Sequence, residues 1–287
     1  MLDEVTQQEF TEHQFTSLVA QVMIDGQVIS TVTLGEEMTG FPVTEDSRFR
    51  NGAVAIMYIG ATMLAMADEG LIDIDEPISR WLPDLPDADQ ATPRMLASMT
   101  AGYPDHVANA DFLAAQAANP FRAWTEDELL AYSAASPRLF APGENWDYSH
   151  AGYMHLGNVL EAASGKTLDE LITKYVLKPL KLDGTVADVT ARIPAPAVHG
   201  FTAERGLFED SSYWNPSWTL PHGAIETTTI GDMTSSFDAI VGRGELLTPE
   251  SHKAMISTDL VGFGAPLEGC RSCHTLTKEW TYGLGVF

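Results

Sequence analysis

The feature that most limits how this chain can fold is the dense apolar run between Gly52 and Gly70. Large apolar side chains recur there on every side of a helix, at Val54, Ile56, Met57, Ile59, Met63, Leu64 and Met66. A surface helix has a single apolar stripe, so a helix this uniformly apolar must be enclosed by other elements. A glycine is also the usual stop at a helix C-terminus. We therefore predict a buried helix that ends at Gly70.

The segment before this helix is typical of a β-hairpin. Residues 18–34 alternate apolar and polar side chains on both sides of Asp25-Gly26, a strong signal for a two-residue turn. The chain has 287 residues, of which 45% are hydrophobic, so it can form one large α/β unit or two subdomains around a substantial core. We expect two antiparallel strands at the start of the chain.

The middle of the chain is predicted to be mainly helical. Thr125 with Glu128, and Thr167 with Glu170, have the spacing of capping boxes within a helix-rich region from about 92 to 180. Such pairs satisfy backbone N–H groups at a helix start, so each marks the beginning of a helix.

The order of the elements favours an α+β fold, in which an antiparallel sheet is flanked by helices and accompanied by a helical subdomain. The other expected elements are helices over 155–163 and 229–241, irregular loops over 185–222 and a strand that begins within 282–287. The expected division is 1–91 for the N-terminal part of the α/β subdomain, 92–222 for the helical part and 223–287 for the return to the α/β subdomain.

The surface carries a large excess of negative charge. The chain has 40 acidic against 16 basic residues, a formal net charge of −24 at pH 7, and the acidic residues are scattered along it. Such a surface repels nucleic acid and anionic membranes, so neither is an expected partner. No stretch reaches the roughly 18 apolar residues that a membrane-spanning helix needs. We interpret the acidity as a property that favours solubility.

The compartment is left open by the sequence. The visible N-terminus, MLDEVTQQEFTEHQF, is acidic and polar, unlike a secretory signal. From this N-terminus we expect a cytoplasmic protein, or a secreted one if an export signal has been removed. Two cysteines in the whole chain do not form a disulfide scaffold.

Four segments, in order along the chain, carry a family resemblance. They are FRNGAVAIMYIGATMLAMADEGLIDIDEPISRWLPDLP, TPRMLASMTAGYPDH, PGENWDYSHAGYMHLGNVLEAASGKTLDELITKYVLKPLKLDGT and PHGAIETTTIGDMTSSFDAIVGRGELLTPES. Their order and spacing resemble the serine β-lactamase and penicillin-binding-protein superfamily, in particular its class C β-lactamases, D-alanyl-D-alanine carboxypeptidases and esterases. The resemblance runs from about residue 15 to the end and implies a β-lactamase/transpeptidase-like fold.

The chemistry of that superfamily needs residues that this chain replaces. A serine attacks an amide or ester carbonyl, and a lysine three residues later accepts its proton. Aligned on Phe49-Arg50, these positions are Ala53 and Ile56, and neither side chain can attack a carbonyl or move a proton. No Ser-x-x-Lys sequence occurs in the chain. Because both positions differ, we interpret the change as native divergence and not as an engineered trap.

The superfamily's catalytic tyrosine corresponds to Tyr148, and His150 takes the place of the usual asparagine. We name Tyr148 and His150 as candidate catalytic residues, and expect Ser149, Trp146 and Tyr103 to line the cleft. A histidine can supply a base near neutral pH, or it can merely keep the hydrogen bond of the asparagine. Ser149 is a poor substitute nucleophile, because adjacent residues point in different directions.

Cys270-Arg-Ser-Cys273-His274 matches the CxxCH pattern of covalent haem attachment. The pattern is weak without its structural context, and it lies in a predicted loop. A local disulfide, a metal-binding pair and two inert thiols are the alternatives. The histidines show no metal-ligand spacing such as HExxH, so we expect no metal site and no cofactor.

The superfamily's third motif, a Lys-Thr-Gly or His-x-Gly strand, is missing from the sequence, which stops at Phe287. We expect the missing C-terminal strands to leave an open sheet edge, which promotes association. The strands are expected in a second polypeptide fragment, although their removal or their supply by a partner chain would have the same effect.

Three functional hypotheses follow. The first is a hydrolase-type protein that acts on a small amide or ester by altered chemistry at Tyr148 and His150. The second is a catalytically inactive family member that binds such a ligand. The third is a haem-carrying redox protein.

Overall fold

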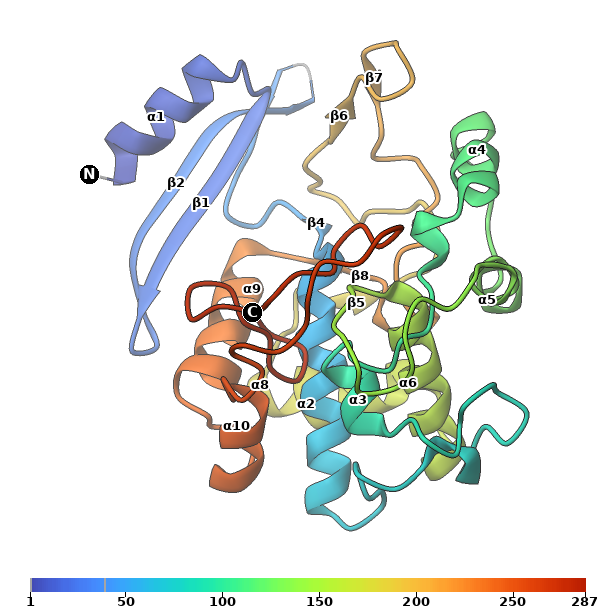
Figure 1. The fold of residues 1–287 in the computed structure, drawn as a ribbon. Helices are drawn as coiled ribbons and strands as arrows, with labels where there is room; N and C mark the ends of the chain where they lie inside the picture. The colour runs from blue at the N-terminus through green and yellow to red at the C-terminus, as the bar shows by residue number, and fades with distance from the viewer. Residues whose placement is uncertain (1, 39) are drawn as a thin grey trace.

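The computed structural model describes residues 2–38 and 40–287, and its antiparallel strands and packed helices confirm the predicted α+β class (Figure 1). The helices are α1 (Leu2–Glu12), α2 (Ala55–Asp68), α3 (Pro93–Ala97), α4 (Ala110–Ala118), α5 (Glu126–Ala135), α6 (His150–Ser164), α7 (Leu168–Ile172), α8 (Lys178–Leu180), α9 (Ile230–Phe237) and α10 (Pro249–Met255). The 3-10 and π-helical turns are η1 (Gly52–Val54), η2 (Ile78–Arg80), η3 (His106–Ala108), η4 (Thr173–Leu177), η5 (His222–Ala224) and η6 (Asp238–Gly242). The strands are β1 (Ser17–Ile24), β2 (Gln27–Met38), β3 (Phe41–Pro42), β4 (Phe49–Arg50), β5 (Val186–Ala187), β6 (Phe201–Thr202), β7 (Glu209–Asp210) and β8 (Glu226–Thr228).

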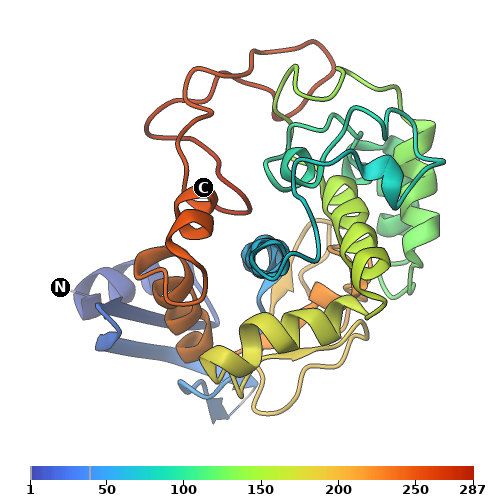
Figure 2. The same ribbon diagram turned by 90° about the horizontal axis from the view of Figure 1, so that it is seen from below.

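Helix α2 runs through the centre of the molecule, and other elements surround it on all sides (Figure 2). Every side chain from Ala55 to Leu64 is buried. The chain leaves the helix at Gly70, which has a φ of +72° and donates its N–H to the Ala67 carbonyl at 2.9 Å. The predicted buried helix and its glycine stop are therefore confirmed.

The predicted hairpin is also confirmed. β1 pairs antiparallel with β2 in a register that sets Ser17 opposite Gly35 and Ile24 opposite Gln27. Asp25 and Gly26 both have positive φ, as a tight turn with strand-compatible twist requires. β3 continues the sheet beyond β2, so that β1 lies at its edge. Helix α9 packs against β1, and α1, which the sequence did not predict, packs against β2.

The helical region follows its capping residues. The capping boxes of Thr125 with Glu128 and of Thr167 with Glu170 are both formed, at the starts of α5 and α7. Helix α6 starts at residue 150 and not at 155, because the side chain of Ser149 caps it. A small second cluster of apolar side chains joins α4 and α5 to α6; its buried members are Phe112, Trp124, Leu129 and Met154.

The segment 282–287 does not form the predicted strand. One of its backbone hydrogen bonds is local, from the Gly283 N–H to the Val286 carbonyl at 2.8 Å. Another reaches the end of α10, from the Leu284 N–H to the Met255 carbonyl at 2.9 Å. The segment lies directly on α2, where any side chain at position 60 would overlap the Leu284 carbonyl. Gly60 thus permits a close backbone approach that brings the C-terminal residues over the start of α2.

One main hydrophobic core joins the three ranges into which the sequence was divided, with buried members such as Ile56, Leu156 and Leu284. The division into subdomains stays a prediction. Across residues 2–38 and 40–287, no helix has the length and apolar character needed to cross a membrane.

Candidate active site

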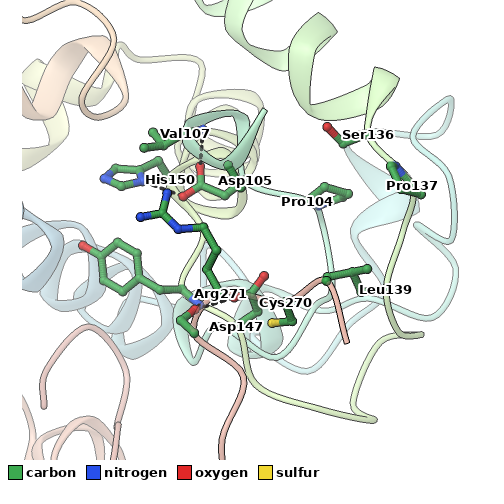
Figure 3. A pocket seen from close by; sticks show the side chains of 14 residues that line it. Pro104, Asp105, Val107, Ser136, Pro137, Leu139, Asp147, His150, Cys270 and Arg271 are labelled. Carbon is green, nitrogen blue, oxygen red and sulfur yellow. Dashed lines mark hydrogen bonds and ion pairs between the residues drawn. The ribbon is translucent and has the colours of Figure 1, made fainter. Parts of the chain in front are cut away.

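A cavity of about 460 Å³ opens beside the N-terminus of α6 (Figure 3). Its chemically active lining comes from three parts of the chain, namely the loop before η3, the start of α6 and the loop 269–272. Polar and sulfur-bearing side chains of this lining include Asp105, Asp147, Tyr148, His150, Cys270 and Arg271.

A second cavity, of about 300 Å³, lies over the N-terminus of α2 and shares Tyr148 with the first. Its lining includes Ala53 from the turn η1, Ile56 from the start of α2, Phe237 from α9 and Phe287 from the C-terminal segment. The structure thus brings the two replaced positions and the surviving tyrosine to one cavity. Tyr148 contributes a hydroxyl group to this cavity, whereas the side chains of Ala53, Ile56, Phe237 and Phe287 contribute only apolar surface.

Ala53 sits in the turn η1, which is anchored to the sheet behind it. The Asn51 N–H donates to the Glu226 carbonyl at 3.2 Å, and Asn51 Nδ2 donates to Glu226 Oε2 at 2.7 Å. Burial of Glu226 raises its pKa to about 8, against a smaller opposite effect of Asn51. Ala53 itself is exposed, whereas Ile56 is only 2% exposed and belongs to the core.

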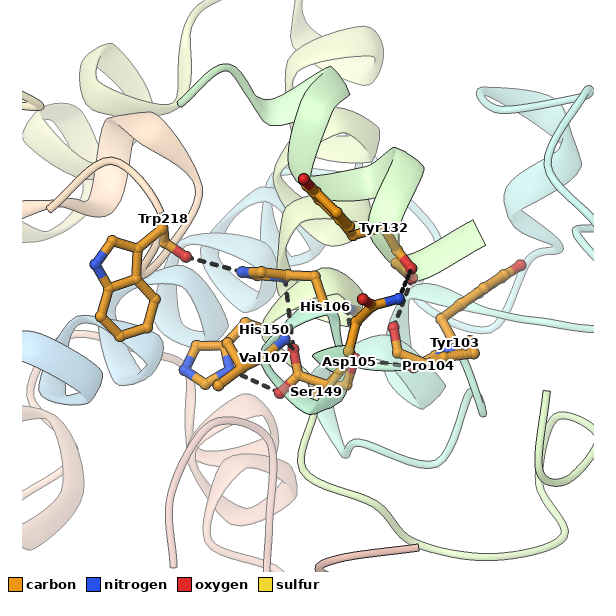
Figure 4. A network of polar contacts seen from close by, with 12 residues as sticks. Tyr103, Pro104, Asp105, His106, Val107, Tyr132, Ser149, His150 and Trp218 are labelled. Atoms are coloured by element: carbon orange, nitrogen blue, oxygen red, sulfur yellow. Dashed lines mark hydrogen bonds and ion pairs between the residues drawn. The ribbon is translucent and has the colours of Figure 1, made fainter. Parts of the chain in front are cut away.

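His150 is held by a carboxylate that is distant in sequence (Figure 4). His150 Nδ1 and Asp105 Oδ2 are 2.8 Å apart, although the two residues are 45 positions apart in the chain. The other oxygen, Asp105 Oδ1, accepts the Val107 N–H at 3.2 Å. Both oxygens of this buried carboxylate therefore have partners, and the imidazole has a fixed orientation.

The charge of Asp105 determines which nitrogen of His150 carries a proton. Burial raises the pKa of Asp105, but the hydrogen bond and charge of His150, with smaller contributions from His106 and the Val107 N–H, outweigh burial and leave that pKa below its ordinary value. An ionised carboxylate can only accept hydrogen bonds, so His150 Nδ1 is the protonated nitrogen. In the neutral ring, Nε2 then keeps a free lone pair, and it points away from Asp105 (Figure 3).

Tyr148 stands beside this imidazole. The two ring centroids are 5.2 Å apart, and the ring planes meet at 72°. Burial, with a smaller contribution from the negative charge of Asp105, raises the pKa of Tyr148 to about 12. Near neutral pH the phenol is therefore a proton donor and not a base.

The three residues expected to line the cleft lie behind its wall instead. The Ser149 hydroxyl accepts the Gly152 N–H at 3.0 Å and donates to the Tyr103 carbonyl at 2.9 Å, so it caps α6 from a buried position. Tyr103 is buried and donates its hydroxyl to the Pro86 carbonyl at 2.8 Å. Trp146 is buried against Tyr282, with ring centroids 5.8 Å apart. None of the three lines either cavity. The reason is that Ser149 caps a helix, Tyr103 binds a loop carbonyl and the Trp146 ring is packed in the core.

Asp105 was not a sequence-based candidate. It lies in the segment TPRMLASMTAGYPDH, and only its position before a short helix could have marked it as a cap. Its pairing with His150 depends on the packing of η3 against α6.

The CxxCH segment contains a Cys270–Cys273 disulfide, one of the alternatives that the sequence left open. Both sulfur atoms are used in this bond, so haem attachment would require its cleavage first. An oxygen of Asp147 and the two sulfur atoms lie within 4.8 Å of one another, a grouping that in the reduced state would offer three metal ligands.

Comparisons with known proteins agree on one superfamily. A family model described as Beta-lactamase matches residues 2–284. Esterase EstB of Burkholderia gladioli is 27% identical over 303 aligned residues, which cover 93% of this chain and 76% of the esterase. A D-stereospecific amidohydrolase from Streptomyces sp. superposes with a TM-score of 0.81 at 25% identity, covering 98% of this chain and 82% of that one. A penicillin-binding protein from Bacillus halodurans shares the fold, with a TM-score of 0.74 at 20% identity over 97% of this chain and 82% of its own.

Proposed function

Since the chain belongs to the Beta-lactamase family, we propose that it binds a small amide or ester and hydrolyses it by a water-based reaction at His150. Its relatives include proteins named as an esterase and an amidohydrolase. Ala53 and Ile56 cannot form the acyl-serine intermediate that this family's serine and lysine make, so the nucleophile has to come from elsewhere. The observation that carries the proposal is the 2.8 Å contact between His150 and Asp105 at the wall of the larger cavity.

The reaction uses His150 together with Asp105, whose pKa is lowered, and Tyr148, whose pKa is raised. His150 Nε2 accepts a proton from a water molecule, whose oxygen attacks the carbonyl carbon of the ester. Asp105 stabilises the imidazolium that forms, and the Tyr148 hydroxyl donates a hydrogen bond to the carbonyl oxygen or to the leaving oxygen. The imidazolium then returns its proton to the leaving alcohol. One water and one ester thus give one acid and one alcohol.

The test is turnover of a nitrophenyl ester by the unmodified protein and by single variants. His150→Gln and Asp105→Asn should each lower kcat/KM by about 100-fold, the usual contribution of a positioned base. The matched control is His199→Gln, because His199 forms a similar pair with Asp210, at 2.6 Å, away from both cavities. Equal turnover by the His150 and His199 variants would rule out a base at His150.

Tyr148→Phe separates binding from chemistry. If the phenol stabilises the reacting oxygen, this variant should lose kcat and keep KM within about threefold. A loss confined to KM would show that Tyr148 only contacts the ligand.

A ligand-binding protein without turnover is the second candidate, and the apolar lining of the Ala53 cavity favours it. That cavity suits an apolar ligand group but offers no nucleophile. Under this alternative, the unmodified protein binds nitrophenyl esters without releasing nitrophenol. Restoring Ala53→Ser together with Ile56→Lys should then create ester hydrolysis, because the site keeps its tyrosine.

A further inference from the structure

The disulfide of this chain faces the candidate active site. Cys270 lines the larger cavity and is half-buried, whereas Cys273 is only 9% exposed and does not line it. A thiol that diffuses into the cavity therefore meets the Cys270 sulfur first. The side chain of Arg271 extends from this loop into the same cavity (Figure 3), and its positive charge favours the approach of a thiolate.

The surroundings of the disulfide also suit the two thiols that its cleavage would produce. The Cys273 N–H donates to Cys270 Sγ at 3.1 Å, a contact that stabilises a thiolate on Cys270. A carboxylate oxygen of Asp147 lies within 4.8 Å of both sulfur atoms.

Ser272 connects the disulfide to the candidate catalytic residues. Its hydroxyl accepts the Tyr148 N–H at 2.9 Å and donates to the Asp147 carboxylate. In the sequence, Ser272 is 124 positions from Tyr148 and 125 positions from Asp147. Ser272 lies between the two bonded cysteines, so the disulfide restricts the backbone that presents this hydroxyl.

We propose that the Cys270–Cys273 disulfide is a thiol-exchange site for small thiols and that its redox state controls the backbone at Tyr148 through Ser272. A small thiolate attacks Cys270 Sγ, forms a mixed disulfide and breaks the bond to Cys273. The Cys273 thiolate takes a proton from water. A second small thiolate attacks the external sulfur of the mixed disulfide and leaves Cys270 reduced, so two small thiols become one small disulfide.

The first experiment counts thiols in the folded protein. The chain contains two cysteines, so every thiol detected comes from this pair. After exposure to dithiothreitol and its removal under nitrogen, Ellman's reagent should find two thiols per chain without denaturant. Two thiols that appear only after unfolding in urea would overturn the proposal.

The second experiment measures the link to Tyr148 by hydrogen–deuterium exchange of its amide. Reduction should make this amide exchange about fivefold faster, the effect expected for loss of one hydrogen bond. The double variant Cys270→Ser/Cys273→Ser should match the reduced protein. Ser272→Ala keeps the disulfide but removes the acceptor, so its Tyr148 amide should exchange fast in both redox states.

Ser136→Ala is the matched control. Ser136 also lines the cavity, but its hydroxyl bonds to the Tyr132 carbonyl and to Asn109. This variant should keep the redox response of Tyr148. An amide at Tyr148 that exchanges equally in both redox states of the unmodified protein would refute the link through Ser272. Neither readout requires turnover, so both distinguish failure of this proposal from failure of the proposed function.

Discussion

Glu226 shows how a single buried group supports the site without lining it. Glu226 is 1% exposed and lies under the turn that carries Ala53. Its side-chain oxygen Oε2 accepts a hydrogen bond from Asn51 Nδ2 at 2.7 Å. Burial outweighs the hydrogen bond from this neutral amide and raises the pKa of Glu226 to about 8. The same residue therefore fixes the turn and makes stability depend on pH.

Replacement of Glu226 by Gln should change the pH dependence of unfolding. Between pH 4.5, the ordinary pKa, and about 8, the folded protein keeps a proton that the unfolded chain releases. The stabilisation is therefore full below pH 4.5 and is lost as the pH rises through 8. Glu226→Gln cannot ionise and should be more stable than the unmodified protein by about 4 kcal/mol at pH 8.5, with little difference at pH 4.5. Urea unfolding at both pH values measures this, and the exposed Glu268→Gln is the control; identical pH dependence of all three proteins would contradict it.

At the level of secondary structure, the N-terminus of α6 positions the candidate base. Ser149 caps this helix, and His150 is its first residue. The cap also ties the helix to the Tyr103 carbonyl, close to the loop that supplies Asp105. The direction of the imidazole thus depends on where the helix begins.

Ser149→Ala should weaken both the helix and the site. Loss of the cap should lower the free energy of unfolding by about 1–2 kcal/mol. Because α6 can then start elsewhere, ester turnover should fall more than stability alone explains. Thr248→Ala removes the cap of α10, where Thr248 accepts the Ser251 N–H at 3.3 Å, and is the control for stability loss away from the site. Equal turnover by the two variants, measured under conditions in which both are fully folded, would show that the Ser149 cap does not position the candidate site.

On the scale of the whole molecule, the sheet of β1, β2 and β3 has an edge at β1. Apolar side chains are exposed along the hairpin, including Val22 at 38% and Ile24 at 56%. An edge strand offers unpaired backbone groups to another strand. We propose that a second polypeptide pairs with β1, as the resemblance in sequence led us to expect.

Association through β1 should be visible in the mass of the native species. Light scattering after size exclusion, at micromolar concentrations, should give a mass above the 31.2 kDa of one chain. Ile24→Lys should reduce the association, because a charge at a sheet edge disfavours further pairing. Leu113→Lys, on an exposed face of α4, should leave it unchanged. A single-chain mass for the unmodified protein at every concentration would contradict the proposal.

Local chemistry was enough to predict several elements from the sequence. The hairpin at Asp25-Gly26 and the capping box of Thr125 with Glu128 depend on interactions within a few residues, and both are present. The buried helix followed from apolar residues on all of its faces. The motif resemblance indicated that Ala53 and Tyr148 belong to one site, and they share a cavity.

Only the tertiary structure decided which groups act together. The pairing of Asp105 with His150 and the bond from Tyr148 to Ser272 join residues 45 and 124 positions apart, which no local pattern specifies. The sequence of the segment 282–287 predicts a strand. In the structure its backbone hydrogen bonds join Leu284 to Met255 at the end of α10 and Gly283 to Val286 within the segment. The sequence by itself determined the hairpin, the buried helix, the capped helix starts and the family, because each depends on residues within short segments. The tertiary structure determined the pairing of His150, the candidate base, with Asp105 and the position of the loop 269–272 beside them, because contacts between distant segments form only when the chain packs around α2.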